Sequence, residues 1–259
     1  MDAGRYETIL VDIDEGIGTV TLNRIEQRNA LNSVMLRELG DACTRLDRDD
    51  NVRVIVIRSA CEGVFCAGAD VKEREGMTEG QLRERRKLAR DTYELLERIE
   101  KPMICAVNGK NFGGGCEIAA CCDFIISSNR ASFCYPEVRW GTLGATQRLT
   151  RLVGKSLAKY YLLTARTITA EEAYRIGLTA VLVDESEFDR TVREIAAQIA
   201  SYSPLSVRLT KKSVNVGAEL DMTNASFFEV QAIETLIAHN EWQKGVEAFM
   251  RRNKNDNPS

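Results

Sequence analysis

The spacing of apolar residues changes character near residue 188 of this chain. Before that point, short runs rich in β-branched residues alternate with stretches in which apolar residues recur every three or four positions. These spacings are typical of buried strands and amphipathic helices. The short runs predict strands at residues 8–13, 19–22, 54–57, 104–107, 124–127, 132–134 and 182–183. The other stretches predict helices at residues 33–46, 78–99, 114–122 and 170–176. This alternation favours an α/β fold with a parallel or mixed sheet covered by helices.

The last part of the chain has helical spacing throughout. It predicts four helices, at residues 188–202, 205–216, 222–238 and 241–251. We therefore expect two regions, a β/α core over residues 1–187 and a helical region over residues 188–259. The helical region carries more apolar positions than peripheral helices need, which predicts a surface buried in an oligomer. Examples are Leu209, Val214, Phe227, Phe228, Ile233, Leu236 and Ile237.

The composition excludes several classes of partner. The chain has 259 residues, of which 44% are hydrophobic, enough for one large domain or a core with an appendage. Its net charge of −3 gives it no electrostatic preference for nucleic acid or an anionic membrane. No apolar run approaches the ~20 residues that span a bilayer. The polar start lacks a signal-peptide core, so we expect a cytoplasmic protein, bacterial in the first instance, with a trimmed organellar form left open.

Eight cysteines and a single histidine, His239, limit the possible metal chemistry. No two cysteines have Cys-x-x-Cys spacing, so we expect no zinc site and no other metal site. Most of the cysteines lie in apolar runs, which predicts small buried hydrophobic residues in a reducing compartment. A catalytic cysteine–histidine pair would have to recruit His239 from a distant helical segment.

Three consecutive glycines at residues 113–115 precede Glu117, and a second acidic residue, Glu137, follows Pro136. Glycines let a backbone approach a ligand and leave the first N–H groups of a helix free. Free N–H groups beside two carboxylates suit acid–base chemistry on a carbonyl compound, because the N–H groups stabilise developing negative charge. Taken alone, the glycine run equally fits a plain helix start. Glu117, however, lies among apolar neighbours, which indicates a functional or paired charge.

Several segments together resemble the enoyl-CoA hydratase/isomerase (crotonase) superfamily. Residues 65–71 read Phe-Cys-Ala-Gly-Ala-Asp-Val, which resembles the family motif F-x-A-G-x-D-[ILV]. Residues 101–109 read Lys-Pro-Met-Ile-Cys-Ala-Val-Asn-Gly and lead into the glycine run, as in the family. Further matches are residues 22–24, 28–32, 117, 123, 136–137, 146–149 and 173–178. The matches follow the family order from about residue 8 to residue 250.

This resemblance implies a crotonase-like ββα spiral core and a C-terminal helical region that forms trimers, or dimers of trimers. It implies an acyl-CoA thioester as substrate and no separate cofactor, because coenzyme A is part of the substrate. The thioester oxygen would accept hydrogen bonds from the N–H groups of Ala69 and Gly114, the latter at a helix N-terminus. Asp70 is also expected to hold its own loop through backbone hydrogen bonds. The residues expected to contact coenzyme A are Arg28, Ala30, Ala67, Gly68, Asp70 and Val71.

Both acidic residues of the family's hydratases are present here, as Glu117 and Glu137. By resemblance, Glu117 orients and activates a water that adds to the β-carbon, and Glu137 exchanges a proton with the α-carbon. We therefore expect an enoyl-CoA hydratase of fatty acid metabolism, working in either direction. Two alternatives stay open. One is an enoyl-CoA delta-isomerase. The other is an RNA-binding hydratase homologue, because residues 57–74 resemble that branch, although the acidic balance of the chain argues against it.

The loop after Glu137 departs from the family pattern G-x-x-P-G-x-G-G-T-Q-R-L. Residues 141–149 read Gly-Thr-Leu-Gly-Ala-Thr-Gln-Arg-Leu, which is three residues shorter and lacks the proline. So short a loop must move the wall of the acyl pocket. We expect Trp140 to contact the substrate and Tyr135 to share the wall, because both offer broad apolar faces. We also expect a preference for branched or cyclic enoyl-CoA esters.

One basic run stands apart from these motifs. It comprises Arg83, Arg85, Arg86, Lys87 and Arg90, interleaved with acidic residues. Such interleaving is typical of the solvated face of a helix, and we expect these residues to face water.

Overall fold

The computed structural model describes residues 6–256, so the first five residues and the last three of the predicted helical region lie outside it. The chain divides into two compact units, Met1–Gln198 and Ile199–Ser259. Helix α8 (Glu185–Ala200) buries Phe188, Val192 and Ala196 and lies almost wholly in the first unit. The contacts of α8 therefore group the helix expected from residue 188 with the first unit.

The larger sheet of the first unit has six strands in the order β1-β2-β3-β5-β7-β10. Strands β1 and β2 are antiparallel, with Ile9 opposite Leu22, and every other neighbouring pair is parallel. All five residues of β5 are buried, as expected of a parallel strand covered on both faces. The strand bounds are β1 (Ile9–Asp14), β2 (Ile17–Leu22), β3 (Val54–Ser59), β5 (Met103–Val107), β7 (Phe124–Ser128) and β10 (Val181–Val183).

A second sheet of four strands has the order β4-β6-β8-β9, with β9 antiparallel to its neighbour. Each strand from β3, β5 or β7 in the first sheet is followed by one in the second and then by helix, which is the repeated ββα spiral. The apolar pattern did not predict β4 and β6, because both are short and contain glycine. The bounds are β4 (Gly63–Cys66), β6 (Gly109–Phe112), β8 (Ser132–Cys134) and β9 (Ile168–Thr169).

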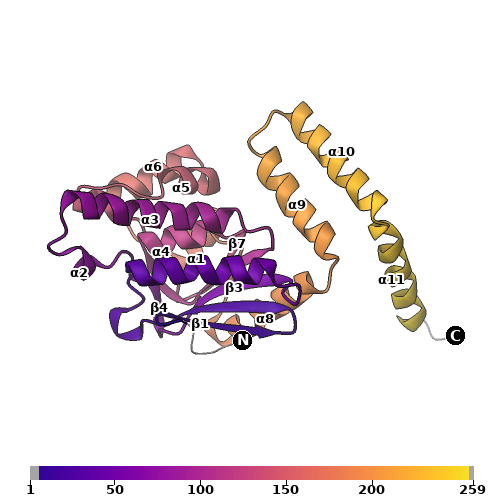
Figure 1. Ribbon diagram of the computed structural model, residues 1–259, viewed down its shortest axis with the longest axis horizontal. Helices are drawn as coiled ribbons and strands as arrows, with labels where there is room; N and C mark the ends of the chain where they lie inside the picture. Colours follow the sequence, from indigo (N-terminus) through magenta and orange to yellow (C-terminus); the bar gives the residue numbers. More distant parts are fainter. Residues whose placement is uncertain (1–5, 257–259) are drawn as a thin grey trace. The chain divides into compact units, whose positions relative to one another are not determined.

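Helices cover the larger sheet, and α1 packs beside α3 (Figure 1). Helix α1 begins where the Asn32 side chain accepts a hydrogen bond from the Met35 N–H, and α3 begins with a capping box of Thr78 and Gln81. Helices α2, α5 and α6 were not predicted, although Leu149, Leu152 and Val153 of α5 have the spacing of an apolar helix face. The bounds are α1 (Ser33–Arg48), η1 (Ile25–Gln27), α2 (Val71–Arg74), α3 (Glu79–Glu97), α4 (Gly114–Cys121), η2 (Glu137–Trp140), α5 (Thr146–Val153), α6 (Lys155–Thr164) and α7 (Ala170–Arg175).

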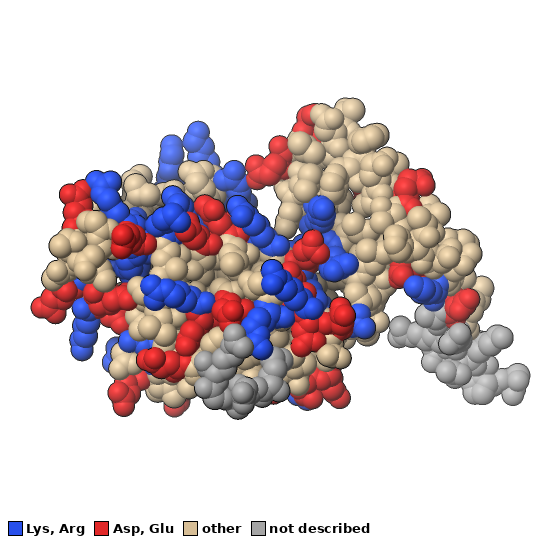
Figure 2. Space-filling view, viewed as in Figure 1, with Lys and Arg blue, Asp and Glu red and all other residues tan. Residues whose placement is uncertain are grey.

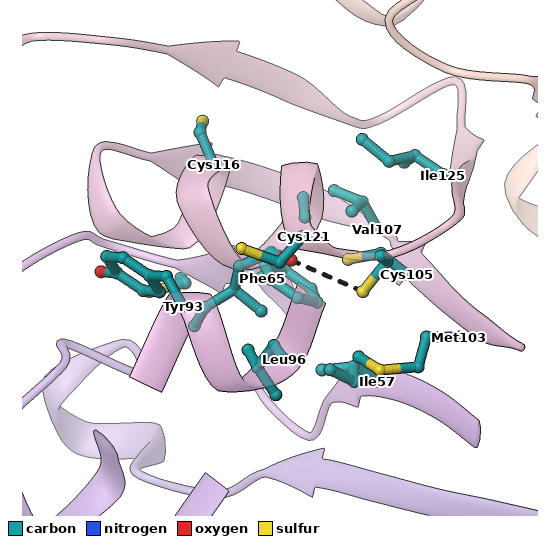
Figure 3. Packing of buried hydrophobic residues seen from close by; sticks show 14 of the residues in the cluster. Ile57, Phe65, Tyr93, Leu96, Met103, Cys105, Val107, Cys116, Cys121 and Ile125 are labelled. Carbon is teal, nitrogen blue, oxygen red and sulfur yellow. Dashed lines mark hydrogen bonds between the residues drawn. The ribbon is translucent and has the colours of Figure 1, made fainter. Parts of the chain in front are cut away.

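Cysteines fill part of the core of the first unit. All eight are free thiols, and all except Cys61 are buried, which confirms their predicted role as small hydrophobic residues. Figure 3 shows Cys105, Cys116 and Cys121 among the buried apolar side chains between helix and sheet. Burial raises the pKa of Cys66 to about 12, so its thiol stays protonated at neutral pH.

The second unit consists of helices α9 (Pro204–Gly217), α10 (Met222–Ala238) and α11 (Glu241–Asp256). Helix α9 packs against α10, yet neither buries a side chain. Figure 2 shows few charged side chains on α9 and α10 from this side, whereas charges of both signs cover the same face of the first unit. The exposed apolar side chains include Val214, Met222, Phe227, Val230, Ile233 and Ile237. Among residues 6–256, no helix is both long and apolar enough to cross a bilayer.

Candidate active site

One cavity of about 610 Å³ in the first unit gathers most of the residues singled out in the sequence. Its walls come from the loop before α2, from α3 and α4, and from η2 with the loop that follows it. The predicted residues that line it are Ala67, Gly68, Ala69, Val71, Gly114, Glu117, Glu137 and Trp140. Arg28, Ala30 and Asp70 lie outside its lining.

Glu117 lies in the first turn of α4, and 8% of this residue's surface is exposed. One carboxylate oxygen accepts a hydrogen bond from the Ala145 N–H, and the other lies 3.1 Å from Arg148 Nη1. Arg148 is itself held by Glu97, with N–O distances of 2.6 and 2.9 Å, and lies over the ring of Tyr93. The ion pair compensates the charge of Glu117 and fixes the direction in which its carboxylate points.

Glu137 opens the short helix η2, close to Glu117. Burial raises the pKa of Glu137, the negative charge of Glu117 raises it further, and the positive charges of Arg86 and Arg74 oppose both. Its Oε2 atom is buried and accepts no hydrogen bond from the described residues. Gly144 lies against this side chain, since a Cβ built there would be 3.0 Å from Glu137 Oε1. Consecutive loop residues, Gly144 and Ala145, therefore contact the two carboxylates in turn.

The two expected backbone donors lie side by side. Leu31 and Ala69 form a parallel β-bridge. The Gly68 carbonyl accepts a hydrogen bond from the Leu31 N–H, and the Asp70 N–H donates one to the Leu31 carbonyl, so the Ala69 N–H points away from Leu31. Gly114 is the first residue of α4, where a helix leaves its N–H groups without partners. A Cβ built on Gly114 would lie 3.9 Å from Ala69 N. The backbones of Ala69 and Gly114 thus lie close together at the N-terminus of α4, a suitable place for an oxyanion.

The loop that leads into α2 is held by Asp70. This side chain accepts hydrogen bonds from the N–H groups of Lys72 and Glu73 and pairs with Arg24 at 2.8 Å, which confirms the expected backbone bonding. Burial opposes ionisation of Asp70, but these bonds outweigh it and hold its pKa below the usual range. Arg28 is joined to the same loop, because its carbonyl accepts the Ala67 N–H at 3.0 Å. The contacts of Arg28, Ala30 and Asp70 with coenzyme A stay predictions.

Two expectations about side chains were wrong. Tyr135 is 1% exposed and does not line the cavity, because it packs inside the core. Arg85 does not face water. It is buried, pairs with Glu73 at 2.9 Å and donates to the Leu31 carbonyl. Arg86 is exposed, as expected, and in addition it lines the cavity and donates to the Thr142 hydroxyl at 2.6 Å.

Three further residues of this site were not predicted from the sequence, namely Arg74, Tyr93 and Arg148. All three line the cavity. Arg148 had a usable signal, since it belongs to the matching segment at residues 146–149. Tyr93 lies on the apolar stripe of α3 and looks like an ordinary core residue there. No pattern in the sequence distinguishes Arg74 from its charged neighbours.

Comparisons with known proteins show the family of this chain. The model of the enoyl-CoA hydratase/isomerase family matches residues 12–257, and the chain belongs to this family. A crotonyl-CoA hydratase of Syntrophomonas wolfei is 39% identical over 96% of this chain and 97% of its own length. A short-chain-enoyl-CoA hydratase of Clostridium acetobutylicum is 38% identical over 95% of each chain. The crystal structure of an enoyl-CoA hydratase from Bacillus anthracis matches with a TM-score of 0.92 at 37% identity, over 95% of this chain and 97% of that chain.

Proposed function

We propose that this enzyme is an enoyl-CoA hydratase that adds water across the 2,3 double bond of an enoyl-CoA thioester, or removes it. One observation carries the proposal. Two glutamates, Glu117 and Glu137, line the same cavity as Ala69 and Gly114, whose backbones lie close together. The names of the two relatives described above support the same reaction.

The surroundings of the two glutamates suggest a division of labour. Glu117, with its charge compensated by Arg148, orients the water and accepts a proton as the hydroxyl group bonds to the β-carbon. We assign to Glu137, whose pKa is raised by burial, the transfer of a proton to the α-carbon. Between these steps, negative charge on the thioester oxygen is stabilised by Ala69 and Gly114. Losing one such donor typically costs about 3 kcal/mol of barrier.

The test is incubation with trans-2-enoyl-CoA esters followed by mass analysis of the product. We expect a hydroxyacyl-CoA that is heavier by one water, formed at a rate proportional to enzyme concentration. A product of unchanged mass with a moved double bond would contradict hydration and support the isomerase alternative. Binding of RNA that weakens steeply with added salt would support the remaining alternative.

The acyl preference within this class stays a prediction. The shortened loop favours branched or cyclic esters, with Trp140 and Leu143 exposed on the cavity wall. The names of the two relatives favour short chains instead. A series of straight, branched and ring-bearing esters, compared by kcat/KM, distinguishes these possibilities. We propose that the reaction takes place in the cytoplasm, which is consistent with the bacterial relatives described above.

We further propose that the protein works as a trimer or a dimer of trimers, because helices α9 and α10 expose large apolar side chains. Sedimentation at micromolar concentration is expected to show a stable oligomer. Phe227, which is 65% exposed in the single chain, provides a test. Phe227→Asp should weaken the assembly, since it places a charge in an apolar interface. Gln231→Glu on the same helix is the matched control. A stable monomer for the parent protein would contradict the proposal.

A further inference from the structure

The cavity that holds the two glutamates is strongly basic. Two carboxylates line it, those of Glu117 and Glu137, against six guanidinium groups. The arginines are Arg74, Arg85, Arg86, Arg90, Arg139 and Arg148. Hydration of an enoyl thioester requires acids and N–H donors, and these steps alone give no reason for six cations on the walls of the cavity.

Half of these arginines are neutralised by carboxylates. Arg85 pairs with Glu73, and Arg148 pairs with Glu97 and Glu117. Arg90 lies 3.2 Å from Asp91 and 3.7 Å from Glu94. A fourth arginine, Arg139, donates to the Ala165 carbonyl at 2.6 Å. Arg85, Arg90 and Arg148 are thus paired with carboxylates, whereas Arg139, an exposed residue, is held by this carbonyl without a carboxylate partner among residues 6–256.

Arg74 and Arg86 have no carboxylate partner among residues 6–256. Arg86 is held by neutral groups, the Thr142 hydroxyl at 2.6 Å and the Leu143 carbonyl at 3.2 Å, so its position is fixed while its charge stays uncompensated. The Nε atom of Arg74 is buried and has no hydrogen-bond partner among the described residues. Burial and the neighbouring charges of Arg85 and Arg86 lower the pKa of Arg74, while Tyr93 and Glu73 oppose this shift, and all three arginines line the same cavity. Leaving this buried Nε–H group without an acceptor is costly, so Arg74 favours a ligand that can accept a hydrogen bond there.

The place of this pair indicates which part of the substrate it would meet. Arg74 and Arg86 act electrostatically on Glu137, the residue proposed to protonate the α-carbon. Arg86 also contacts the shortened loop, where Thr142 and Leu143 form the cavity wall, and Arg74 lines the same cavity from α2. The phosphates of coenzyme A are separated from the reacting carbons by the whole pantetheine arm. A carboxylate at the far end of a short acyl chain is only a few bonds away.

We propose that the preferred substrate is a dicarboxylic enoyl-CoA, whose free carboxylate is bound by Arg74 and Arg86. A guanidinium group suits this ligand because it donates two parallel hydrogen bonds to a carboxylate. The inference rests on the proposed hydratase function and specifies its substrate class. It also gives a use to two cations that the hydration steps do not need.

A direct test compares two saturated esters of equal chain length, pentanedioyl-CoA and pentanoyl-CoA, which differ in a terminal carboxylate or methyl group. Their binding to the parent protein is measured by calorimetry, so the result does not depend on turnover. We expect pentanedioyl-CoA to bind about tenfold more tightly or better, as charge-assisted hydrogen bonds provide. Equal or weaker binding of pentanedioyl-CoA would overturn the proposal, while the hydratase assignment is judged separately by water addition to trans-2-pentenoyl-CoA.

Substitutions identify the residues responsible. Arg74→Gln and Arg86→Gln should each remove most of the preference for pentanedioyl-CoA over pentanoyl-CoA, and Arg86→Lys should retain part of it. Arg98→Gln is the matched control, because this residue caps the same helix as Arg86 and its side chain is 80% exposed. Equal weakening of both esters by Arg74→Gln and Arg86→Gln would mean that these residues bind coenzyme A or hold the loop, and it would overturn the proposal.

Discussion

Glu117→Gln and Glu137→Gln are each expected to lower turnover at least about 100-fold, the lower range for residues that transfer protons in the transition state. Both substitutions keep the size of the side chain and remove its ability to accept and deliver a proton. The measurement is kcat on the best enoyl-CoA ester of a substrate series. Binding of the ester should change far less, because the thioester is recognised by Ala69 and Gly114. Near-parental turnover in either variant would rule out the two-acid mechanism.

A stability measurement shows that such a loss does not come from unfolding. Because folding raises the pKa of Glu137, its contribution to stability is present below the unfolded pKa and is lost as the pH rises through the folded pKa. Glutamine does not titrate, so Glu137→Gln is expected to be more stable than the parent at about pH 7. The difference should shrink toward about pH 4, near the ordinary pKa of glutamate. Chemical denaturation of both proteins at the two pH values measures it.

Gly109→Ala is expected to have the largest effect on stability. Gly109 begins β6 opposite Gly63 of β4, with a φ of 149°. A Cβ at this position would lie 2.3 Å from the carbonyl carbon of Gly63, and a backbone atom cannot move aside as a side chain does. We expect the free energy of unfolding to fall by about 3 kcal/mol or more, from overpacking and backbone strain together. Activity should fall with it, because β6 leads into the glycine run before α4.

Gly80→Ala is the matched control for this prediction. Gly80 lies in α3, and the nearest atom to a Cβ built there is the Thr78 hydroxyl oxygen at 4.0 Å. Alanine is the better helix former, so this variant should be as stable as the parent or slightly more stable. Denaturant unfolding of the three proteins provides the comparison. A Gly109→Ala protein within about 1 kcal/mol of the parent would show that β4 and β6 are less closely packed than described.

Much of the fold was predictable because its determinants are local. The buried strands β3, β5 and β7 are runs of β-branched and apolar residues, and the predicted helix at residues 222–238 agrees with α10. The family motifs led to Glu117 and Glu137, and the structure places both on one cavity. For these parts, the side-chain pattern and the backbone conformation depend on the same neighbouring residues.

Only the tertiary structure decided the remainder. Strands β4 and β6 are too short to show a pattern, and they exist because the spiral brings residues 63–66 and 109–112 together. Arg85 and Arg86 are adjacent in one basic run, yet the first is neutralised by Glu73 and the second lines the cavity without a carboxylate partner among the described residues. The sequence determined that these charges exist. What each charge meets depends on the segments packed against α3, because Coulomb attraction and desolvation act through space and not along the chain.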